Sequence, residues 1–468
     1  MTDQKTIEQY FEAHREEMLR DMSTLIRIPS EKGEPKEGMP FGEYPAKALA
    51  AAVKIAKDMG FSVKNVDNYA AAVDLNDLPR QLDILAHLDV VPAGNGWTVT
   101  QPFEPLVKDG RLYGRGSADD KGPAIAALYA LKAVRDLNVP LKKNARLVLG
   151  TDEECGSADI TYYYEQEPEA PMIFSPDAAF PVVNIEKGRY SIWMKAGWKE
   201  DLALPRILSV HGGVKSNVVP DTAEAVVEGL SAQELSACTA AAAVRTGISF
   251  EWKENNGKIV VEAHGACAHA SSPGDGNNAI TGLIDLLVGI PFAKSEGFEK
   301  LCAVNQLFPH GDWLGKAPGV AMEDEISGPL TMSLNLFEYE LTGLKGYFDG
   351  RTPVCATNEN LKDIFCAKAR AQGLTPDDKG VSPAHHVPKD TPFIQTLLKC
   401  YEQYSGRKGE CMAIGGGTYA HRLKNGVGFG CSMPETDNRM HGADEYAVIE
   451  ELLMGAKIFT QAIIDLCS

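Results

Sequence analysis

The sequence predicts an α/β protein in which a second, α+β domain is inserted into the first. The chain has 468 residues, which is more than a single hydrophobic core usually serves. Over residues 1–185, strand-like and helix-like segments alternate, as is typical of a mixed, mostly parallel sheet with flanking helices. Alternating segments typical of antiparallel strands follow up to about residue 381. We therefore expect one domain of residues 1–186 and 382–468, and an inserted domain of residues 187–381.

The elements of the first domain follow from its apolar patterns. Residues 43–59 predict a helix that ends near Gly60, and a long Ala/Leu-rich helix covers about 123–137. Its start at Pro123 is favourable, because proline fits the first helical turn. Three short apolar runs predict strands at 82–86, 145–150 and 171–174, and each is followed by a polar cluster (HLD, TDEE, SPD). In open α/β sheets, functional groups gather at the carboxyl ends of strands, so a site is expected there.

The inserted domain and the C-terminal part have different patterns. RYSIWMKAG, AEAVVEGL and GKIVVEAHG alternate as antiparallel strands do, and helical stretches lie near 231–245, 277–289 and 358–372. The chain then returns to helix, strand and helix. The final helix has an apolar face at helical spacing, formed by Val448, Leu452, Phe459 and Ile463.

Composition and charge exclude several classes of function. With 46 basic and 64 acidic residues, the net charge is −18, which disfavours nucleic acid as a partner. No apolar run approaches the ~18 residues of a membrane span, and the charged N-terminal stretch lacks the apolar core of a signal peptide. The ten cysteines are scattered without a CxxC pair, which favours a reducing compartment. We therefore expect a cytoplasmic protein without a membrane partner.

The first candidate site residues are His87 and Asp89 in LAHLD. At positions i and i+2 of an extended chain, both side chains point to the same side. The imidazole could bind a metal while the carboxylate orients it. Taken alone, the pair is better explained as a histidine at a strand end beside a solvated aspartate.

Two pairs of neighbouring acidic residues follow along the chain. GRGSADDKG (114–122) contains Asp119 and Asp120, and GTDEECGS contains Glu153 and Glu154. Neighbours at a strand exit point in different directions, so one glutamate could bind a metal while the other acts as general base. The alternatives are a charged surface turn for the aspartates and an acidic helix N-terminus for the glutamates.

Asp177 in FSPDA and His441 in RMHGADEY complete the set, although each alone could be a loop residue. Five carboxylates at one sheet edge would repel one another strongly without cations. Two divalent metal ions would remove that repulsion. Two histidines with several carboxylates fit zinc, with manganese or cobalt as alternatives.

The segments LAHLDVVPAG, GRGSADDKGP, GTDEECGS, SPDAAFP and RMHGADEY together resemble those of the two-zinc metallopeptidases that include carboxypeptidase G, aminoacylase and the PepV-type dipeptidases. They occur in order along the whole chain, and the inserted domain of about 195 residues is most similar to the PepV-type branch. The resemblance implies a two-metal catalytic domain with an inserted lid domain. It also implies a dipeptidase that acts on small unblocked peptides, and we expect a monomer because a large lid could supply its histidine within one chain.

The resemblance assigns roles to the metal-binding candidates. His87 and Asp177 would bind one Zn²⁺, Glu154 and His441 would bind the other, and Asp119 would bridge them. Asp119 is chosen because the bridging aspartate is the first residue of an Asp-x-Lys-Gly motif. The resemblance also implies an unusual peptide geometry, of the cis type, between Asp119 and Asp120.

Further roles follow from the same resemblance. Glu153 matches the general base toward the water between the metals, Asp89 matches the acidic partner of His87, and His269 in GACAHASSP would stabilise the oxyanion. The substrate contacts are expected from Asn217 in SNVVPD, from Arg351 in FDGRTP, which would bind the substrate carboxylate, and from Gly416 in AIGGGTYA. Without the resemblance, His269 would be interpreted as a loop histidine, Arg351 as a surface arginine and the Gly416 segment as a tight turn.

Two other functions stay open. One is an N-acyl amino acid deacylase on the same zinc centre, and the other is a catalytically inactive binding protein on the same fold. The complete set of expected metal ligands argues against the inactive protein. The chain departs from its relatives at Gly350, where they usually carry a bulkier apolar residue, and at Cys267 in the His269 segment.

Overall fold

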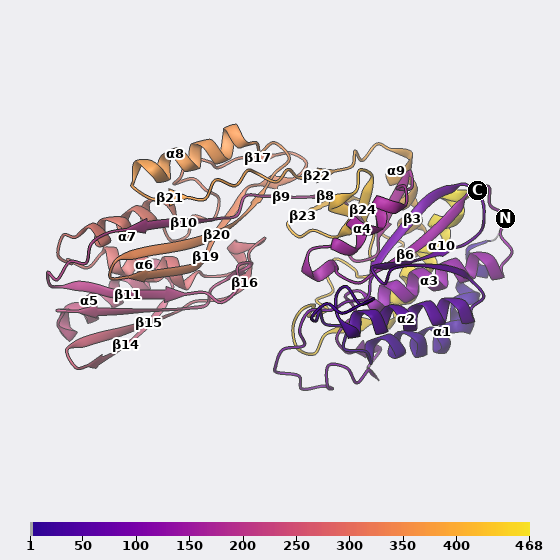
Figure 1. Cartoon of the computed structure of the whole chain (residues 1–468), viewed down its shortest axis with the longest axis horizontal. Helices are drawn as coiled ribbons and strands as arrows, with labels where there is room; N and C mark the ends of the chain where they lie inside the picture. The colour runs from indigo at the N-terminus through magenta and orange to yellow at the C-terminus, as the bar shows by residue number, and fades with distance from the viewer. Residues whose placement is uncertain (1–2) are drawn as a thin grey trace. The chain divides into compact units, whose positions relative to one another are not determined.

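The computed structural model describes residues 3–468, and the α/β class expected from the sequence is confirmed (Figure 1). The chain forms two compact units. Unit 1 comprises Met1–Ile185, His386–Met412 and Gly417–Ser468, and unit 2 comprises Glu186–His385 and Ala413–Gly416. Among residues 3–468, no helix combines the length and the apolar character that a membrane span requires.

Unit 1 is built on a mixed sheet with a parallel centre. The predicted strands 82–86, 145–150 and 171–174 are β3 (Arg80–His87), β6 (Asn144–Gly150) and β7 (Met172–Ser175), and β3 runs parallel to both others. Their carboxyl ends therefore meet at one edge of the sheet. The remaining strands lie outside these three, in the order β1-β2-β6-β3-β7-β24-β8-β22 with β23 beside β8: β1 (Ser62–Val66), β2 (Ala70–Asp74), β24 (Gly426–Gly428), β8 (Val182–Glu186), β22 (His385–His386) and β23 (Cys411–Ile414).

Helices cover both faces of this sheet. The main core contains the apolar sides of α1 (Gln4–Ile26), α2 (Glu43–Asp58), α3 (Lys121–Asp136), α9 (Pro392–Ser405) and α10 (Ile449–Cys467), packed on one face (Figure 1). A smaller cluster on the other face includes Ile160 and Tyr163 of α4 (Ala158–Gln166). The predicted helices at 43–59 and 123–137 are therefore confirmed as α2 and α3. The final helix packs against α3, so the C-terminal segment completes the core of unit 1.

A small three-stranded sheet brings two distant motifs together. In it, β5 (Arg111–Tyr113) pairs with β4 (Leu106–Lys108) and with β25 (Tyr446–Val448). GRGSADDKG follows β5 directly, and RMHGADEY ends in β25. The pairing thus places the segments that contain Asp119 and His441 side by side.

Unit 2 is an antiparallel sheet covered by helices. Its strands are ordered β14-β15-β13-β11-β19-β20-β10-β21, with β9 beside β20: β14 (Ser249–Asn255), β15 (Lys258–His264), β13 (Thr222–Glu228), β11 (Arg206–Gly212), β19 (Thr331–Glu340), β20 (Gly343–Thr352), β10 (Ile192–Gly197), β21 (Thr375–Pro376) and β9 (Gly188–Arg189). The predicted helices are found as α5 (Ala232–Thr246), α6 (Ala279–Val288) and α8 (Asp363–Ala371), the last preceded by a π-helical turn at Asn358–Lys362. A fourth helix, α7 (Glu296–Leu307), was not predicted. The apolar residues of sheet and helices form one core.

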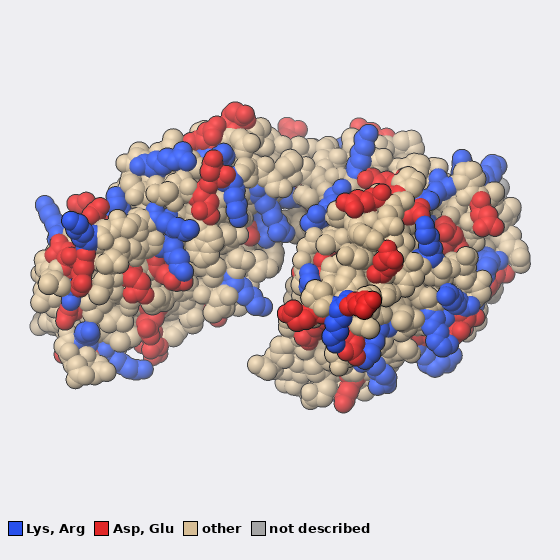
Figure 2. Space-filling model, in the orientation of Figure 1, with Lys and Arg blue, Asp and Glu red and all other residues tan. Residues whose placement is uncertain are grey.

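Figure 2 shows acidic and basic side chains interspersed over both units on the face in view. Within residues 3–468, all ten cysteines are free thiols.

Candidate metal centre

The carboxyl ends of the three central strands deliver most of the expected site residues. His87 is the last residue of β3, and Asp89 follows it by two. Glu153 and Glu154 begin a single 3-10 turn just after β6, and Asp177 lies two residues beyond β7. Because these strands are parallel neighbours, side chains from three separate motifs meet at one sheet edge.

The expected metal ligands form two groups that share one aspartate. The first group is His87, Asp119 and Asp177, with His87 Nε2 at 3.0 Å from Asp119 Oδ1 and 3.6 Å from Asp177 Oδ2. The second group is Asp119, Glu154 and His441, with His441 Nε2 at 2.8 Å from Asp119 Oδ2 and 3.3 Å from Glu154 Oε1. Each oxygen of Asp119 therefore faces a different histidine.

The donor atoms of these groups fit divalent cations. Within residues 3–468, the buried atoms His87 Nε2 and Glu154 Oε1 have no hydrogen-bond partner, although each lies close to further potential ligand atoms. A buried polar atom without a partner is unfavourable, so such atoms usually serve a ligand or an ion. Imidazole nitrogens combined with carboxylates match zinc, and manganese or cobalt as alternatives.

The electrostatics of the site show an excess of negative charge. Burial, with the nearby carboxylates, raises the pKa of Glu153 well above its usual value, and burial followed by the Asp119 charge raises the pKa values of Glu154 and Asp177. Burial also acts to raise the pKa of Asp119, but the nearby imidazoles of His441 and His87 outweigh it and the pKa is lowered. The nearby carboxylates of Asp119 and Glu154 raise the pKa of His441 to about 11. The carboxylates thus hold positive charge tightly, as a cation site requires.

Asp89 does more than the sequence indicated. His87 Nδ1 hydrogen-bonds to the backbone carbonyl oxygen of Asp89 at 3.1 Å, and the carboxylate oxygen Oδ1 of Asp89 lies farther away, at 3.5 Å. The two carboxylate oxygens of Asp89 also accept hydrogen bonds from the backbone N–H groups of Glu153 and Glu154, each at 3.1 Å. Asp89 therefore contacts the histidine through its carbonyl oxygen and holds the backbone of both glutamates through its carboxylate.

Asp119 and Asp120 face different partners. Asp119 lies between the histidines, whereas Asp120 Oδ2 accepts a hydrogen bond at 3.0 Å from the backbone N–H of His87. The peptide bond between the two aspartates is cis, as expected. Asp120 thus supports the strand end that carries a candidate ligand.

Lys121 and Gly122, which end the same motif, are also explained by local contacts. Lys121 is fully buried, and its Nζ donates a hydrogen bond of 2.6 Å to the carbonyl oxygen of Ile28. A Cβ atom at Gly122 would come within 2.1 Å of the carbonyl oxygen of Ser117. The close backbone approach therefore requires glycine, and the turn can enter α3 only with this residue.

Two buried residues near the site were not predicted. Asp159 Oδ2 accepts hydrogen bonds from the backbone N–H groups of Thr151 and Asp152 and from the hydroxyl of Tyr419. These bonds hold the segment that leads into Glu153. The available signal was weak, because Tyr419 lies in AIGGGTYA beside the glycines and Asp159 lies early in α4.

The expected catalytic residue of unit 2 lies on a small two-stranded ladder. His269 belongs to β16 (Ala268–His269), which pairs with β12 (Val218–Val219), and the carbonyl oxygen of Asn217 accepts a hydrogen bond from Ala270 N–H at 2.9 Å. Both His269 and Asn217 are exposed. His269 Nδ1 lies 2.6 Å from Ser271 Oγ, which orients the ring.

Arg351 lies close to the glycine-rich segment of unit 2. It is buried, and its Nε and Nη2 donate to the two oxygens of Asp349 at 2.6 and 3.0 Å, while Nη1 donates to the Gly415 carbonyl oxygen. Gly416 follows directly, and a Cβ at Gly415 would meet Ser271 at 2.5 Å. Contacts within unit 2 thus connect Arg351 to the His269 segment. The exposed Arg189, which the sequence did not single out, is the cross-strand partner of Arg351.

Gly350 has a structural reason to be a glycine. A Cβ atom at this position would approach the carbonyl oxygen of Tyr190 to 2.5 Å. The backbone N–H of Tyr190 also donates to the Gly350 carbonyl oxygen at 2.9 Å. The backbone of β20 beside Arg351 therefore lies in close contact with the backbone of Tyr190.

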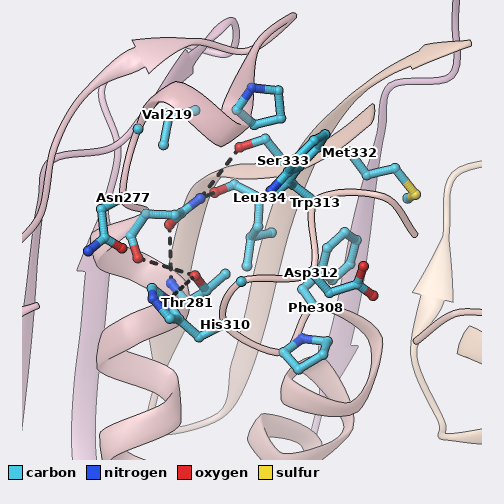
Figure 3. A pocket seen from close by; sticks show the side chains of 15 residues that line it. Val219, Asn277, Thr281, Phe308, His310, Asp312, Trp313, Met332, Ser333 and Leu334 are labelled. Carbon is cyan, nitrogen blue, oxygen red and sulfur yellow. Dashed lines mark hydrogen bonds between the residues drawn. The ribbon is translucent and has the colours of Figure 1, made fainter. Parts of the chain in front are cut away.

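A pocket in unit 2 is lined by none of the expected site residues (Figure 3). His310 lies at one wall, where its Nδ1 is 3.0 Å from Thr281 Oγ1 and its Nε2 is 2.9 Å from the Thr246 carbonyl oxygen. Burial lowers the pKa of His310, so the neutral ring is favoured. With both ring nitrogens engaged, this histidine is explained by its packing.

Comparisons with known proteins were made on the whole chain. The model of the family described as Peptidase family M20/M25/M40 matches residues 84–465. A Bacillus subtilis (strain 168) protein, YtjP, whose name contains the word dipeptidase, is 36% identical over 458 residues, with 97% of each chain covered. The Beta-Ala-Xaa dipeptidase of Lactobacillus delbrueckii subsp. lactis is 33% identical over 466 residues, again with 97% of each chain covered.

Solved structures show the same fold at low sequence identity. Human carnosine dipeptidase 1 has a TM-score of 0.60 at 14% identity, with 100% of this chain and 99% of that chain covered. The aminoacylhistidine dipeptidase from Vibrio alginolyticus has a TM-score of 0.58 at 15% identity, with 96% of each chain covered.

Proposed function

This chain belongs to the peptidase family M20/M25/M40, and from that premise we propose that it is a two-metal dipeptidase that hydrolyses the peptide bond of short, unblocked peptides. The chain is a hydrolase of the peptidase class, and its relatives carry dipeptidase names. One observation carries the finer proposal. Asp119 is shared between two histidine–carboxylate groups, with one oxygen directed to each histidine.

Two divalent cations would be held by these groups. We propose that His87, Asp119 and Asp177 hold one and that Asp119, Glu154 and His441 hold the other, with zinc as the ion and manganese or cobalt as alternatives. When bound, such ions supply positive charge that polarises a carbonyl and lowers the pKa of an attacking water. The buried atoms without hydrogen-bond partners support this assignment.

Glu153 is proposed as the general base. It lies outside both ligand groups, although its neighbour Glu154 belongs to one, and the backbone of both residues is held by Asp89. Its carboxylate would take a proton from the attacking water as the new C–O bond forms. It would then pass this proton to the nitrogen of the leaving amine as the C–N bond breaks.

Unit 2 is proposed to supply the substrate contacts. His269, oriented by Ser271, would stabilise the developing oxyanion. Arg351 would recognise the substrate carboxylate, with Asn217 and Gly416 as further contacts. The contacts that connect Arg351, Gly415 and Ser271 within unit 2 support a common role for these segments.

The remaining assignments complete the proposal. Residues 1–186 and 382–468 would form the catalytic domain, and residues 187–381 the lid domain. We propose a monomer whose partner is a small peptide, without a nucleic-acid or membrane partner. The ten free thiols support a reducing compartment such as the cytoplasm.

A reconstitution experiment tests the function. The protein is stripped of metal, reloaded with Zn²⁺ or Mn²⁺ separately, and assayed on a panel of free dipeptides and on N-acetylated amino acids. We expect metal-dependent release of amino acids from free dipeptides and little release from the N-acetylated compounds. Hydrolysis of the N-acetylated compounds alone would replace the proposal with the deacylase. Metal binding without hydrolysis of either set would indicate an inactive binding protein.

A further inference from the structure

Glu445 holds the turn that carries Asp119, although it has no role in the proposed chemistry. It is fully buried, and its Oε1 accepts hydrogen bonds from the backbone N–H groups of Gly116, Ala118 and Asp119 at 2.9, 3.1 and 3.3 Å. Its Oε2 accepts a hydrogen bond from Arg115 Nη1. One carboxylate therefore binds the whole turn that ends in the shared aspartate.

The partner of this carboxylate is itself held in place. Arg115 is buried, and its Nη2 lies 3.4 and 3.3 Å from the carbonyl oxygens of Pro92 and Ala93. Its guanidinium lies over the ring of Trp97, at 5.5 Å from the centroid. The positive charge opposite Glu445 is thus fixed by contacts independent of the ligands.

Glu445 also connects the two segments that contribute to the second metal group. It lies four residues after His441, and its carbonyl oxygen accepts a hydrogen bond of 3.0 Å from Gly114 N–H. The Asp119 oxygens lie 3.0 and 2.8 Å from the nitrogens of His87 and His441. Because the Asp119 side chain belongs to both ligand groups, a displacement of the Asp119 backbone would alter both groups together.

The chemistry of the contacts requires a carboxylate at this position. Four donors converge on the Glu445 side chain, three from the backbone and one from Arg115. An ionised carboxylate accepts on both oxygens, whereas a glutamine amide would direct its own donor at one of these groups. We propose that Glu445, paired with Arg115, is a positioning residue that sets the affinity of the metal centre by holding the main chain of Asp119. This inference rests on the metal centre of the proposed function.

The chain offers a matched control. Asp83 and Arg146 form another buried carboxylate–guanidinium pair in unit 1, with bonds of 3.0 and 2.7 Å. Asp83 also accepts from Tyr164 OH and from Ala170 N–H, and within residues 3–468 its carboxylate bonds to no candidate ligand and to no residue of the Asp119 turn. Loss of this pair should therefore destabilise the fold without displacing Asp119.

The experiment measures Zn²⁺ binding to the full chain by competition with a fluorescent zinc indicator. The parent protein is compared with the variants E445Q, E445D and D83N, and each is also unfolded thermally. We expect E445Q to raise the zinc dissociation constant about 10–100-fold, the usual effect of losing a residue that supports a ligand. D83N should lower the unfolding temperature while leaving the zinc dissociation constant unchanged. E445D, which keeps the charge but is shorter, should give a smaller increase.

The outcomes separate this inference from the function on which it rests. A parent protein that binds no Zn²⁺ overturns both. Unchanged affinity in E445Q overturns the positioning role alone, as does a loss in D83N equal to that in E445Q. If E445Q fails to fold, E445D decides, because unchanged zinc affinity there also overturns the inference and a several-fold loss supports it.

Discussion

The candidate metal centre of unit 1 and the His269 segment of unit 2 are built in different ways. In unit 1, the side chains of His87, Asp119 and Glu154 are at most 9% exposed, and buried carboxylates hold the backbone around them. In unit 2, His269 is exposed and lies on a ladder of two residues per strand. Ligand geometry is thus set by a network of hydrogen bonds, whereas the oxyanion candidate depends on a short local segment.

The difference teaches where a substitution should act. In the metal centre, removal of the Asp119 carboxylate changes both ligand groups at once, because this side chain is shared. At His269, the side chain can be removed with little loss of packing. Variants in the two regions should therefore differ in whether activity falls with metal binding or without it.

The largest effect is expected at the shared aspartate. D119N should lose bound metal and all activity, because both ligand groups use this side chain. D120N should keep more of both, with about 10–100-fold weaker metal binding, because it removes only a support of the His87 backbone. Metal content after dialysis, measured beside turnover, checks the pair. Equal losses in both variants would contradict the division of roles.

Substitution of Glu153 should reduce activity without reducing metal binding. E153Q should retain both metal ions but lose about 10²–10⁴-fold in kcat, the scale typical of general acid–base groups. Metal analysis and steady-state kinetics on the same preparation provide the test. Near-normal turnover would remove Glu153 from the mechanism.

At His269, the prediction is a loss of turnover with an unchanged metal centre. H269A should lower kcat about 10²–10³-fold, as removal of an oxyanion donor does, with little change in KM or unfolding temperature. H264A is the matched control, because His264 is a partly exposed histidine on β15 of the same unit. Equal kinetics in the two variants would argue against the assigned role.

Substitution of Arg351 should have the smallest kinetic effect, and this effect should depend on the free carboxylate of the substrate. R351K keeps the charge but loses the planar fork, so KM for free dipeptides should rise about tenfold while KM for dipeptide amides changes little. R189K provides the comparison, because Arg189 is the exposed cross-strand neighbour. A larger rise in R189K would transfer carboxylate recognition to Arg189.

Much of the fold could be predicted because its signals are local. The strands β3, β6 and β7 are short apolar runs, and α2 and α3 have long apolar faces. The helix α7 was missed, since its buried side includes Gly297 and Ala303, which weaken the periodic signal. Two-residue strands such as β12 and β16 could not be predicted, because they exist only through their pairing.

The candidate site could be predicted where residues of metal-binding types occur in short sequence motifs. His87, Asp119, Glu154, Asp177 and His441 were named from such motifs, and the structure brings them together. The backbone contacts of Asp89 and Glu445 were not foreseen. They join the side chain of one segment to the N–H groups of another that lies far along the chain, and composition or spacing carries no record of such bonds.

The discontinuity of unit 1 has a consequence for the synthesis of the protein. Unit 2 is nearly continuous in sequence, whereas the metal groups need Asp177 and, roughly 260 residues later, His441. At ~5–20 residues per second, a ribosome needs about 13–50 s to cover that interval. During this time the surface of α3 that α10 later covers has no partner, while unit 2 can already fold. The second candidate ligand group is therefore complete only once His441 has emerged, and chaperone demand should be highest before α10 covers α3.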